Sequence, residues 1–230
     1  MSKTAPILVD VIFPCLNEAG SLPWIIERLP EGYRAIVVDN GSTDGSAEVA
    51  EKLGALVIHE SKKGFGSATH AGLLAAMAPI IVFSDADSTL DPQDFPRVVN
   101  PLIANEAELV MARKVASEKV SWSLSGRLAN KFLAWKLRQL TGYELHDLGV
   151  MRAAKREDLL ALGLEDRRSG YPLEMVLRAK ANDWRVLEVE APYYPRVGKS
   201  KVTGTPLGFL IAVHDMSKLL QAYSKKLGLK

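Results

Sequence analysis

Short apolar runs alternate with amphipathic segments along the first half of the chain. The runs have the length of buried strands, and the segments between them repeat apolar residues at the spacing of a helix. We predict strands over residues 7–13, 33–39, 55–59 and 79–84, and helices over residues 20–29, 42–53 and 66–77. Strands that are apolar throughout and separated by helices predict a parallel sheet covered by helices on both faces.

The second half of the chain begins with a short helix after Asp91-Pro92 and then changes character. We predict a strand over residues 107–112, helices over residues 121–140 and 172–181, a strand over residues 185–190, and a last helix from Pro206. No linker or repeat interrupts the pattern. One domain over residues 1–230 is therefore expected, with residues 1–112 and 113–230 as its two halves.

The predicted helix over residues 121–140 is amphipathic. Its expected apolar side carries four large residues, Leu124, Leu128, Phe132 and Leu140. Three cations recur at spacings of four and seven and therefore share a face, namely Arg127, Lys131 and Arg138. A solvated helix surface explains any one of these cations equally well.

The composition is that of a globular domain, with 47% apolar and 24% charged residues. No apolar stretch approaches the roughly 18 to 20 residues that cross a bilayer, and the first residues do not resemble a secretory signal. A cytoplasmic protein is therefore expected. The single cysteine, Cys15, excludes an internal disulfide and a Cys-rich zinc site.

The net charge of +2 hides an asymmetry between the two halves of the chain. Residues 1–112 hold 7 basic and 15 acidic side chains, whereas residues 113–230 hold 22 basic and 12 acidic ones. Scatter over a solvated surface is one explanation. The other is a single binding site with an acidic side and a basic side.

Two carboxylates, Asp85 and Asp87, follow directly after the predicted strand over residues 79–84. Open α/β sheets bind ligands at the carboxyl ends of their strands. Carboxylate oxygens at that edge suit Mg²⁺ or Mn²⁺, which typically share one or two carboxylates with substrate phosphates. A turn or a helix cap is the alternative explanation for an isolated Asp-x-Asp. Acceptor-rich loops over residues 13–18 and 37–44 are expected at the same edge.

These motifs together resemble the family 2 glycosyltransferases with the GT-A fold. The resemblance rests on Pro-x-x-Asn-Glu after the first strand, Val-Val-Asp-x-Gly-Ser-x-Asp after the second, Gly-x-Gly-x-Ala, and Asp-Ala-Asp. Where the family commonly has two aspartates, this chain has Asp39-Asn40. Residues 147–153, the helix of Glu174 and residues 196–201 are similar to the branch of dolichyl-phosphate mannose and polyprenyl-phosphate glucose synthases. The implied fold is a Rossmann-like, mostly parallel α/β sheet with helices on both faces.

The resemblance also implies roles for individual residues. The nucleoside pocket would be lined by Pro14, Leu16, Glu18 and Asp39, and residues 62–67 would form one of its walls. Nucleotide and metal would be held by Asp85, Ala86 and Asp87. Donor phosphates would be contacted by Arg113, Arg196 and Lys201, and the acceptor phosphate would lie near Arg127.

The implied activity is inverting transfer of a hexose from a UDP-glucose or GDP-mannose type of donor to polyprenyl or dolichyl phosphate. We assign Asp87, Arg127 and Glu174 to catalysis. A lipid phosphate is already an anion and needs no general base, whereas a small hydroxyl acceptor needs a carboxylate such as Glu174 or Asp147. Alternatively, Glu174 is a helix-surface carboxylate paired with an arginine, and Asp147 anchors a loop.

Other classes of function are open to different degrees. A nucleotide-sugar-binding module without catalysis is one alternative, and intact Asp85 and Asp87 speak against it. Nucleic acid is not an expected partner, because the aromatic residues show no interleaved stacking pattern. A homo-oligomer is compatible with the sequence. The last helix has an apolar stripe and lysines near its end. This pattern suits either a peripheral contact with an anionic bilayer or packing on the domain. The stripe consists of Leu210, Val213, Leu220 and Tyr223, and the lysines are Lys218, Lys225 and Lys226.

Overall fold

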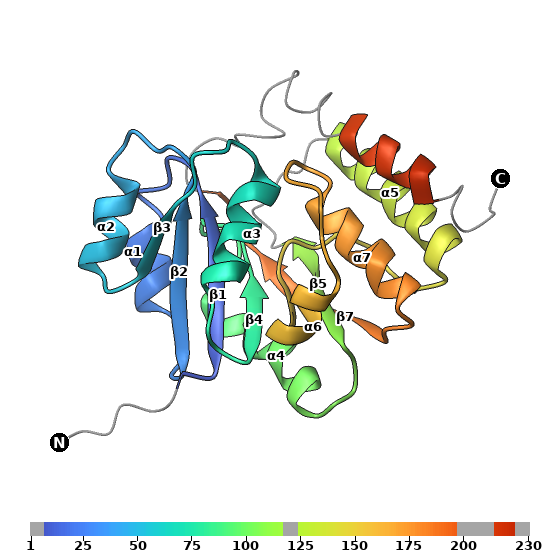
Figure 1. The fold of residues 1–230 in the computed structure, drawn as a ribbon, viewed down its shortest axis with the longest axis horizontal. Coiled ribbons are helices and arrows are strands. Elements are labelled where there is room, and N and C mark those ends of the chain that lie inside the picture. The colour runs from blue at the N-terminus through green and yellow to red at the C-terminus, as the bar shows by residue number, and fades with distance from the viewer. Residues whose placement is uncertain (1–6, 117–123, 197–213, 224–230) are drawn as a thin grey trace.

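A seven-stranded sheet forms the centre of the molecule in a computed structural model that describes residues 7–116, 124–196 and 214–223 (Figure 1). The strand order is β3-β2-β1-β4-β6-β5-β7. The strands are β1 (Val9–Cys15), β2 (Tyr33–Asp39), β3 (Leu56–His59), β4 (Ile80–Phe83), β5 (Leu109–Ala116), β6 (Arg152–Lys155) and β7 (Val186–Tyr193). Only β6 runs antiparallel to its two neighbours, so the expected mostly parallel sheet is confirmed.

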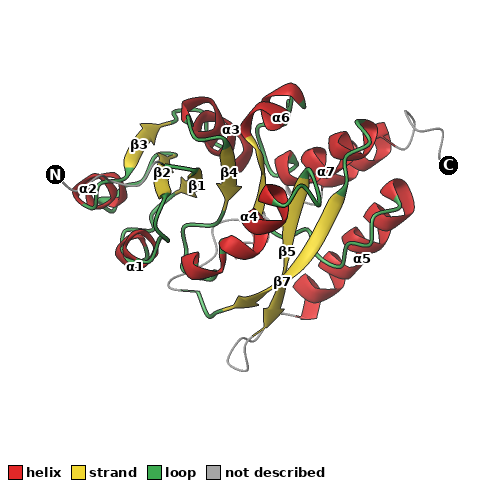
Figure 2. Cartoon of the chain, turned by 90° about the horizontal axis from the view of Figure 1, so that it is seen from below, coloured by secondary structure: helices red, strands yellow, loops and turns green. Residues whose placement is uncertain are grey.

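Helices cover both faces of the sheet, as the alternation of strands and helices predicts (Figure 2). Seven α-helices have bounds in the described chain: α1 (Leu22–Glu27), α2 (Ser46–Lys52), α3 (Phe65–Ala75), α4 (Pro96–Ile103), α5 (Leu124–Thr141), α6 (Arg156–Ala161) and α7 (Tyr171–Ala181). Residues 92–94 form a 3₁₀ turn before α4, and residues 214–223 are also helical.

Two hydrophobic cores result, one on each face of the sheet. Alternate residues of β1 contribute side chains to the two cores, because successive side chains of a strand point to opposite faces. Ile12 belongs to the core that includes residues of α3, α5, α6 and α7, whereas Val11 and Phe13 belong to the core that includes residues of α1 and α4. Leu220 and Tyr223 of the last helix pack against the first of these cores. For these two residues the predicted alternative, packing on the domain, is confirmed. Leu210, Val213, Lys225 and Lys226 lie outside the described residues.

The structure corrects the predicted start of the second helix. α2 begins at Ser46 instead of Ser42, because residues 42–45 form a turn that Gly45 completes in the left-handed region at φ 83°. Asp39 accepts a hydrogen bond from the amide of Ser42 within this turn. The polar residues that predict a helix cap thus build the loop after β2.

The structure also corrects the predicted apolar side of the long helix. Ala134, Leu137 and Leu140 of α5 are buried, whereas Phe132 is 59% exposed. A helix of 3.6 residues per turn places Phe132 outside the face that residues 134, 137 and 140 present to the core. β6 and α6 add two elements that no periodic pattern predicts. None of the described helices is long and apolar enough to cross a membrane.

Candidate active site

The loops after β1 and β2 form one hydrogen-bonded unit at the carboxyl edge of the sheet. The amide of Asn17 donates to Ser42 Oγ over 2.9 Å, and the amide of Glu18 donates to Ser46 Oγ over 2.9 Å. The Asn17 side chain in turn accepts a hydrogen bond from the amide of Thr43 over 2.8 Å. The prediction that these loops gather at one edge is confirmed, and Glu18 is held within them by its own backbone.

Asp39 ends β2 at the centre of this unit. Its Oδ1 accepts the amide of Ser42 over 3.0 Å, and its Oδ2 lies 3.5 Å from Nδ1 of His59. Burial raises the pKa of Asp39, but hydrogen bonds from Ser42, Gly41 and His59 outweigh it and hold that pKa below its ordinary value. The carboxylate therefore stays ionised and can accept hydrogen bonds from a ligand's hydroxyl groups.

Asn40 fastens the chain between β3 and α3 to the same loops. Its Nδ2 donates to the carbonyls of Glu60, over 2.7 Å, and Lys62, over 2.9 Å. Its Oδ1 accepts the amide of Gly64 over 2.9 Å. An aspartate at this position would have no donor for the two carbonyls. Asn40, where the chain departs from the family pattern, thus holds the segment between β3 and α3 in place.

Asp87 is the buried member of the carboxylate pair after β4. Its Oδ1 accepts hydrogen bonds from the amide of Thr89, over 3.1 Å, and from Thr89 Oγ1, over 2.6 Å. Its Oδ2 is buried, receives no hydrogen bond from the described residues, and faces the guanidinium of Arg196 as an ion pair. Ser88, at φ 58°, bends the chain sharply enough for these contacts.

Asp85 is partly exposed beside Asp87. The pKa of Asp85 is raised to about 6 by burial and by repulsion from Asp87, against the opposing effect of Lys114, Arg196 and Arg152. Two neighbouring carboxylates that repel each other fit a hard divalent cation, and in this structure the Oδ2 of Asp87 pairs with Arg196. The described part of the chain holds no group of three or more His, Cys, Asp or Glu side chains that could bind a metal ion by themselves. The donor set therefore suits an ion that a diphosphate also ligates.

Lys114 and Arg152 are cations near this pair that the sequence did not single out. Lys114 interacts electrostatically with Asp85, and its Nζ lies 3.9 Å from Asp147 Oδ2. Arg152 stands opposite Phe83 in the register of β6 on β4, which brings it next to the turn that carries Asp85. Burial lowers the pKa of Arg152 to about 10, although Asp147, Tyr171 and Asp85 favour its charged form.

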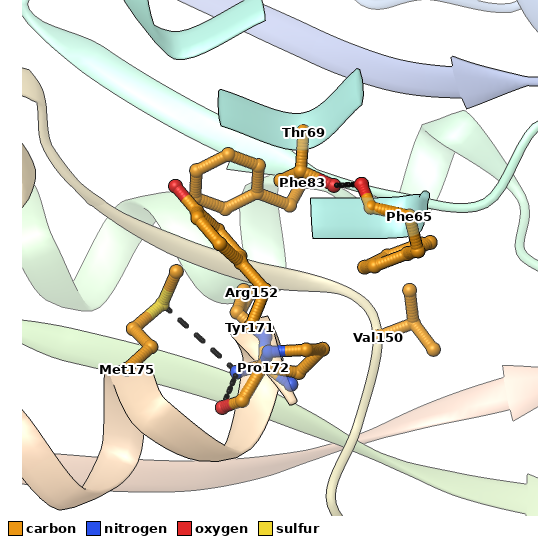
Figure 3. A pocket seen from close by; sticks show the side chains of 8 residues that line it. All are labelled: Phe65, Thr69, Phe83, Val150, Arg152, Tyr171, Pro172 and Met175. Carbon is orange, nitrogen blue, oxygen red and sulfur yellow. Dashed lines mark hydrogen bonds between the residues drawn. The ribbon is translucent and has the colours of Figure 1, made fainter. Parts of the chain in front are cut away.

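A small pocket lies around the guanidinium of Arg152, with Phe65, Val150 and Pro172 among its walls (Figure 3). The guanidinium donates to the carbonyl of Pro172 over 2.8 Å and to that of Gly149. Among the described residues no carboxylate forms an ion pair with it. The guanidinium is therefore held by neutral carbonyls, and its charge interacts with the nearby anions Asp147 and Asp85.

Arg113 points away from that pair. Successive side chains of β5 lie on opposite faces of the sheet, so Arg113 pairs with Glu190 and lies 3.9 Å from Glu188 Oε2, while Lys114 faces Asp85. The structure places Arg196 beside Asp87, and it places Lys114, not Arg113, near Asp85. The difference is a single residue along the strand, which the sequence alone does not resolve.

Glu174 is buried within α7 instead of lying on its surface. Its Oε2 accepts the amides of Glu165, over 3.0 Å, and Asp166, over 2.7 Å. Its Oε1 accepts Nε of Arg178 over 2.6 Å. These contacts correct the surface placement, retain the expected arginine partner, and favour an anchoring role for Glu174 over that of a base.

Asp147 also accepts a hydrogen bond from the backbone. It is buried, and its Oδ2 accepts the amide of Lys114 over 3.2 Å. Its own amide donates to Glu188 Oε1 over 3.1 Å. Gly149 follows at a point where an added Cβ would collide with the carbonyl of Ala112. The segment from Asp147 is therefore packed onto β5, which favours the loop-anchoring alternative.

The remaining predicted site residues divide into three groups. Pro14 is half-buried in β1 and Leu16 is exposed at its end, where both can border a ligand. Ala86 has its methyl group in the core, so only its backbone is available. Arg127 belongs to α5, but its side chain lies outside the described residues, as does Lys201.

The fold and this arrangement define the class of protein. A mostly parallel sheet with an Asp-x-Asp pair at the carboxyl end of β4 is the GT-A fold of nucleotide-diphosphate-sugar transferases. The chain belongs to glycosyl transferase family 2, because the model of that family matches residues 10–161. The protein is accordingly a glycosyltransferase.

Individual relatives extend this finding. The chain is 46% identical over 213 residues to an uncharacterized glycosyltransferase, Rv0539, of Mycobacterium tuberculosis (strain ATCC 25618 / H37Rv), which covers 92% of this chain and 97% of that protein. It is 28% identical over 183 residues to a dolichyl-phosphate hexose transferase of Haloferax volcanii, with 80% of each chain covered.

A solved structure is similar over nearly the whole chain. It is glucosyl-3-phosphoglycerate synthase from Mycobacterium tuberculosis in complex with Mn²⁺, UDP-glucose and phosphoglyceric acid. The TM-score is 0.71 at 26% identity, with 96% of this chain and 80% of that chain covered. The GT-A fold expected from the sequence is thereby confirmed.

Proposed function

We propose that this glycosyltransferase moves a hexose from a nucleotide-diphosphate sugar, of the UDP-glucose or GDP-mannose type, to a polyprenyl or dolichyl phosphate. The observation that carries the proposal is the carboxylate pair Asp85 and Asp87, with Lys114 and Arg196 close to it at the carboxyl edge of the sheet. The dolichyl-phosphate hexose transferase among the relatives supports the lipid acceptor.

The nucleoside end of the donor belongs at the joined loops after β1 and β2. We assign its contacts to Pro14, Leu16, Glu18 and Asp39, with the ionised Asp39 as acceptor for hydroxyl groups. Ala86 contributes its backbone. Asn40 contributes indirectly, by holding the segment over residues 60–64 beside this pocket.

Mg²⁺ or Mn²⁺ belongs at Asp85 and Asp87, whose oxygens fit a hard cation, and the Mn²⁺ of the similar synthase supports this. Bound there, the ion would neutralise negative charge on the departing diphosphate. Lys114 and Arg196 add fixed positive charge at the same place, and Lys201 joins them by its position in the sequence. Such preorganised charge lowers the barrier, since it needs no rearrangement when the bond breaks.

The acceptor phosphate supplies its own nucleophile. One of its anionic oxygens forms a bond to the anomeric carbon while the bond from that carbon to the diphosphate breaks, and the nucleoside diphosphate leaves with the electron pair. No proton moves, so no general base is required. This agrees with the contacts of Glu174 and Asp147, both of which are engaged in holding backbone. A single displacement of this kind inverts the anomeric carbon. Arg127 is assigned to the acceptor phosphate.

A small hydroxyl acceptor is the second candidate. It is supported by the phosphoglyceric acid in the similar synthase. This reaction would require a carboxylate near the attacking hydroxyl. Glu174 would then have to leave the amides of Glu165 and Asp166, at the cost of unsatisfied backbone donors.

Release of nucleoside diphosphate from each donor, with Mn²⁺ and a short polyprenyl phosphate, tests the assignment of the charged residues. Asp87→Asn is expected to lower the rate by about 100-fold or more, because a preorganised charge is removed. Lys114→Met is expected to lower it by a similar factor, and Arg113→Met by much less. Glu106→Gln, on the exposed surface, is the matched control. Full activity of folded Asp87→Asn would contradict the proposal.

A further inference from the structure

The outer face of α5 presents two large aromatic side chains to solvent. Phe132 is 59% exposed and Trp135 is 46% exposed, and their ring centroids are 5.8 Å apart. The opposite side of the helix is fixed in the core through Leu137 and Leu140. The pair therefore forms one exposed apolar patch whose orientation the fold determines. Isolated exposed apolar residues are ordinary, but adjoining aromatic residues of this size point to a binding surface.

Positive charge surrounds this patch. Lys131, Lys136 and Arg138 are exposed on the same helix, and Nζ of Lys136 lies 5.2 Å from the ring centroid of Trp135. The sequence of α5 contains four cations and no acidic residue, LSGRLANKFLAWKLRQLT. The helix lies at the end of the molecule opposite α2 (Figure 1).

We propose that the outer face of α5, which consists of Lys131, Phe132, Trp135, Lys136 and Arg138, docks the protein on the surface of an anionic lipid bilayer. Aromatic side chains favour the boundary between headgroups and acyl chains. Lysine and arginine around them attract anionic headgroups, while their apolar stems lie along the boundary. The proposal deepens the proposed function and rests on it, because a polyprenyl phosphate acceptor resides in such a surface.

A second copy of the chain is a poorer occupant of the same face. An isologous contact would bring the cations of one α5 against those of the other, and like charges in contact oppose association. The last helix is also a poorer site for the bilayer. Its Leu219, Leu220 and Tyr223 pack against the core, which leaves Lys218 without an exposed apolar stripe among the described residues.

Flotation of the full chain with vesicles that contain no polyprenyl phosphate tests the proposal separately from turnover. The expected result is binding to phosphatidylcholine vesicles with about one third phosphatidylglycerol, and weak binding to phosphatidylcholine alone. Lys136→Glu with Arg138→Glu is expected to weaken binding at least 25-fold, since each basic residue at such a surface contributes about fivefold. Phe132→Ser with Trp135→Ser is expected to abolish binding at moderate salt.

Matched controls lie on other surfaces. Leu74→Ser with Met77→Ser removes exposed apolar residues of α3 and the turn after it, and Lys52→Glu reverses an exposed charge of α2. Both are expected to leave flotation unchanged. Absence of binding by the unmodified protein would overturn the proposal, as would equal loss in the control variants. A dimer in light scattering that dissociates on Phe132→Ser with Trp135→Ser would also overturn it and assign the face to self-association. Flotation without sugar transfer would contradict the proposed acceptor alone.

Discussion

The side-chain amide nitrogen of Asn40 holds a loop beside the proposed pocket for the sugar nucleotide. This nitrogen donates hydrogen bonds to two carbonyls of the segment over residues 60–64, and the side-chain oxygen accepts one from an amide of the same segment. The family pattern predicts an aspartate here, and this chain departs from it. Because the carbonyls of Glu60 and Lys62 need donors, the asparagine is required by this particular loop.

Asn40→Asp is therefore expected to destabilise the loop although it restores the family pattern. Two carbonyls would face a carboxylate, and the part-buried carbonyl of Glu60 would lose its donor, which costs about 1–3 kcal/mol. We expect a lower midpoint of thermal unfolding and a several-fold higher KM for the donor. Differential scanning calorimetry and initial rates measure the two effects. Unchanged stability together with an unchanged KM in Asn40→Asp would contradict the role given to Asn40.

Other residues at this scale could be predicted from the sequence only in part. Asp85 and Asp87 were identifiable because they follow an apolar run that ends at the ligand-binding edge of a sheet. Lys114 was not, because the resemblance points to its neighbour Arg113, and only the pleat of β5 shows which of the two faces Asp85. Arg152 lies in the segment over residues 147–153 that carries the resemblance, but nothing in that segment predicts a buried cation, since an arginine is usually exposed.

At the scale of elements, predictability follows the strength of the apolar pattern. β2 has the predicted bounds, because its apolar residues are bordered by polar ones. β6 has the sequence RAAK, in which two small residues between cations form no strand pattern. Its antiparallel place between β4 and β5 depends on partners distant in the sequence. In α5 the apolar residues outnumber the positions that face the core, so Phe132 could be assigned to the wrong side.

Glu174 connects α7 to the segment before it, so its substitution distinguishes an anchor from a base. Glu174→Gln removes the charge that Arg178 and two amides share, and we expect a loss of stability of about 1–3 kcal/mol. For a chain of this size that loss lowers the unfolding midpoint by roughly 2–4 °C per kcal/mol. The value of kcat at saturating donor is expected to change little.

Calorimetry and steady-state kinetics on the same preparation separate the two roles. Glu157→Gln, on the exposed side of α6, is the matched control. A variant of Glu174 that keeps full stability but loses about 100-fold or more in kcat would identify Glu174 as the base instead.

Asp10 joins β1, β2 and the turn before β4 at the amino edge of the sheet, and it gives stability a dependence on pH. It is fully buried on β1, pairs with Arg34 of β2 over 2.8 and 2.9 Å, and accepts the amides of Met77, over 2.7 Å, and Ala78, over 2.9 Å. Burial raises the pKa of Asp10, but Arg34 and the two amides outweigh it and hold that pKa below 3.8.

A carboxyl whose pKa is lower in the folded than in the unfolded state stabilises the fold above the unfolded pKa. That contribution is lost as the pH falls through the lower, folded value. We expect Asp10→Asn to cost about 1.5–3 kcal/mol near neutral pH, because it leaves the partly exposed Arg34 without its charged partner. Urea unfolding from pH 7 down to the acid range should show this difference shrinking below about pH 4. A constant difference across that range would contradict the assignment.

On the scale of the whole molecule, the charge asymmetry has a structural counterpart. The acidic half supplies Asp39, Asp85 and Asp87 at the carboxyl edge, and the basic half supplies Lys114, Arg152 and Arg196 to the same place. The basic half also holds the cations of α5. The two halves are not separate layers, since β6 enters the sheet between β4 and β5. The sequence predicted the division of charge, whereas the interleaving of strands required the structure.

The central claim is that the acceptor is a polyprenyl phosphate, and the mass of the product tests it most directly. The full chain is incubated with UDP-glucose or GDP-mannose and Mn²⁺, together with equal amounts of a short polyprenyl phosphate and 3-phosphoglycerate. Mass spectrometry should detect a polyprenyl-phosphate hexose with at least one donor and leave the phosphoglycerate unchanged. A hexosylated phosphoglycerate without any glycosylated lipid would contradict the account and establish the small-acceptor reaction.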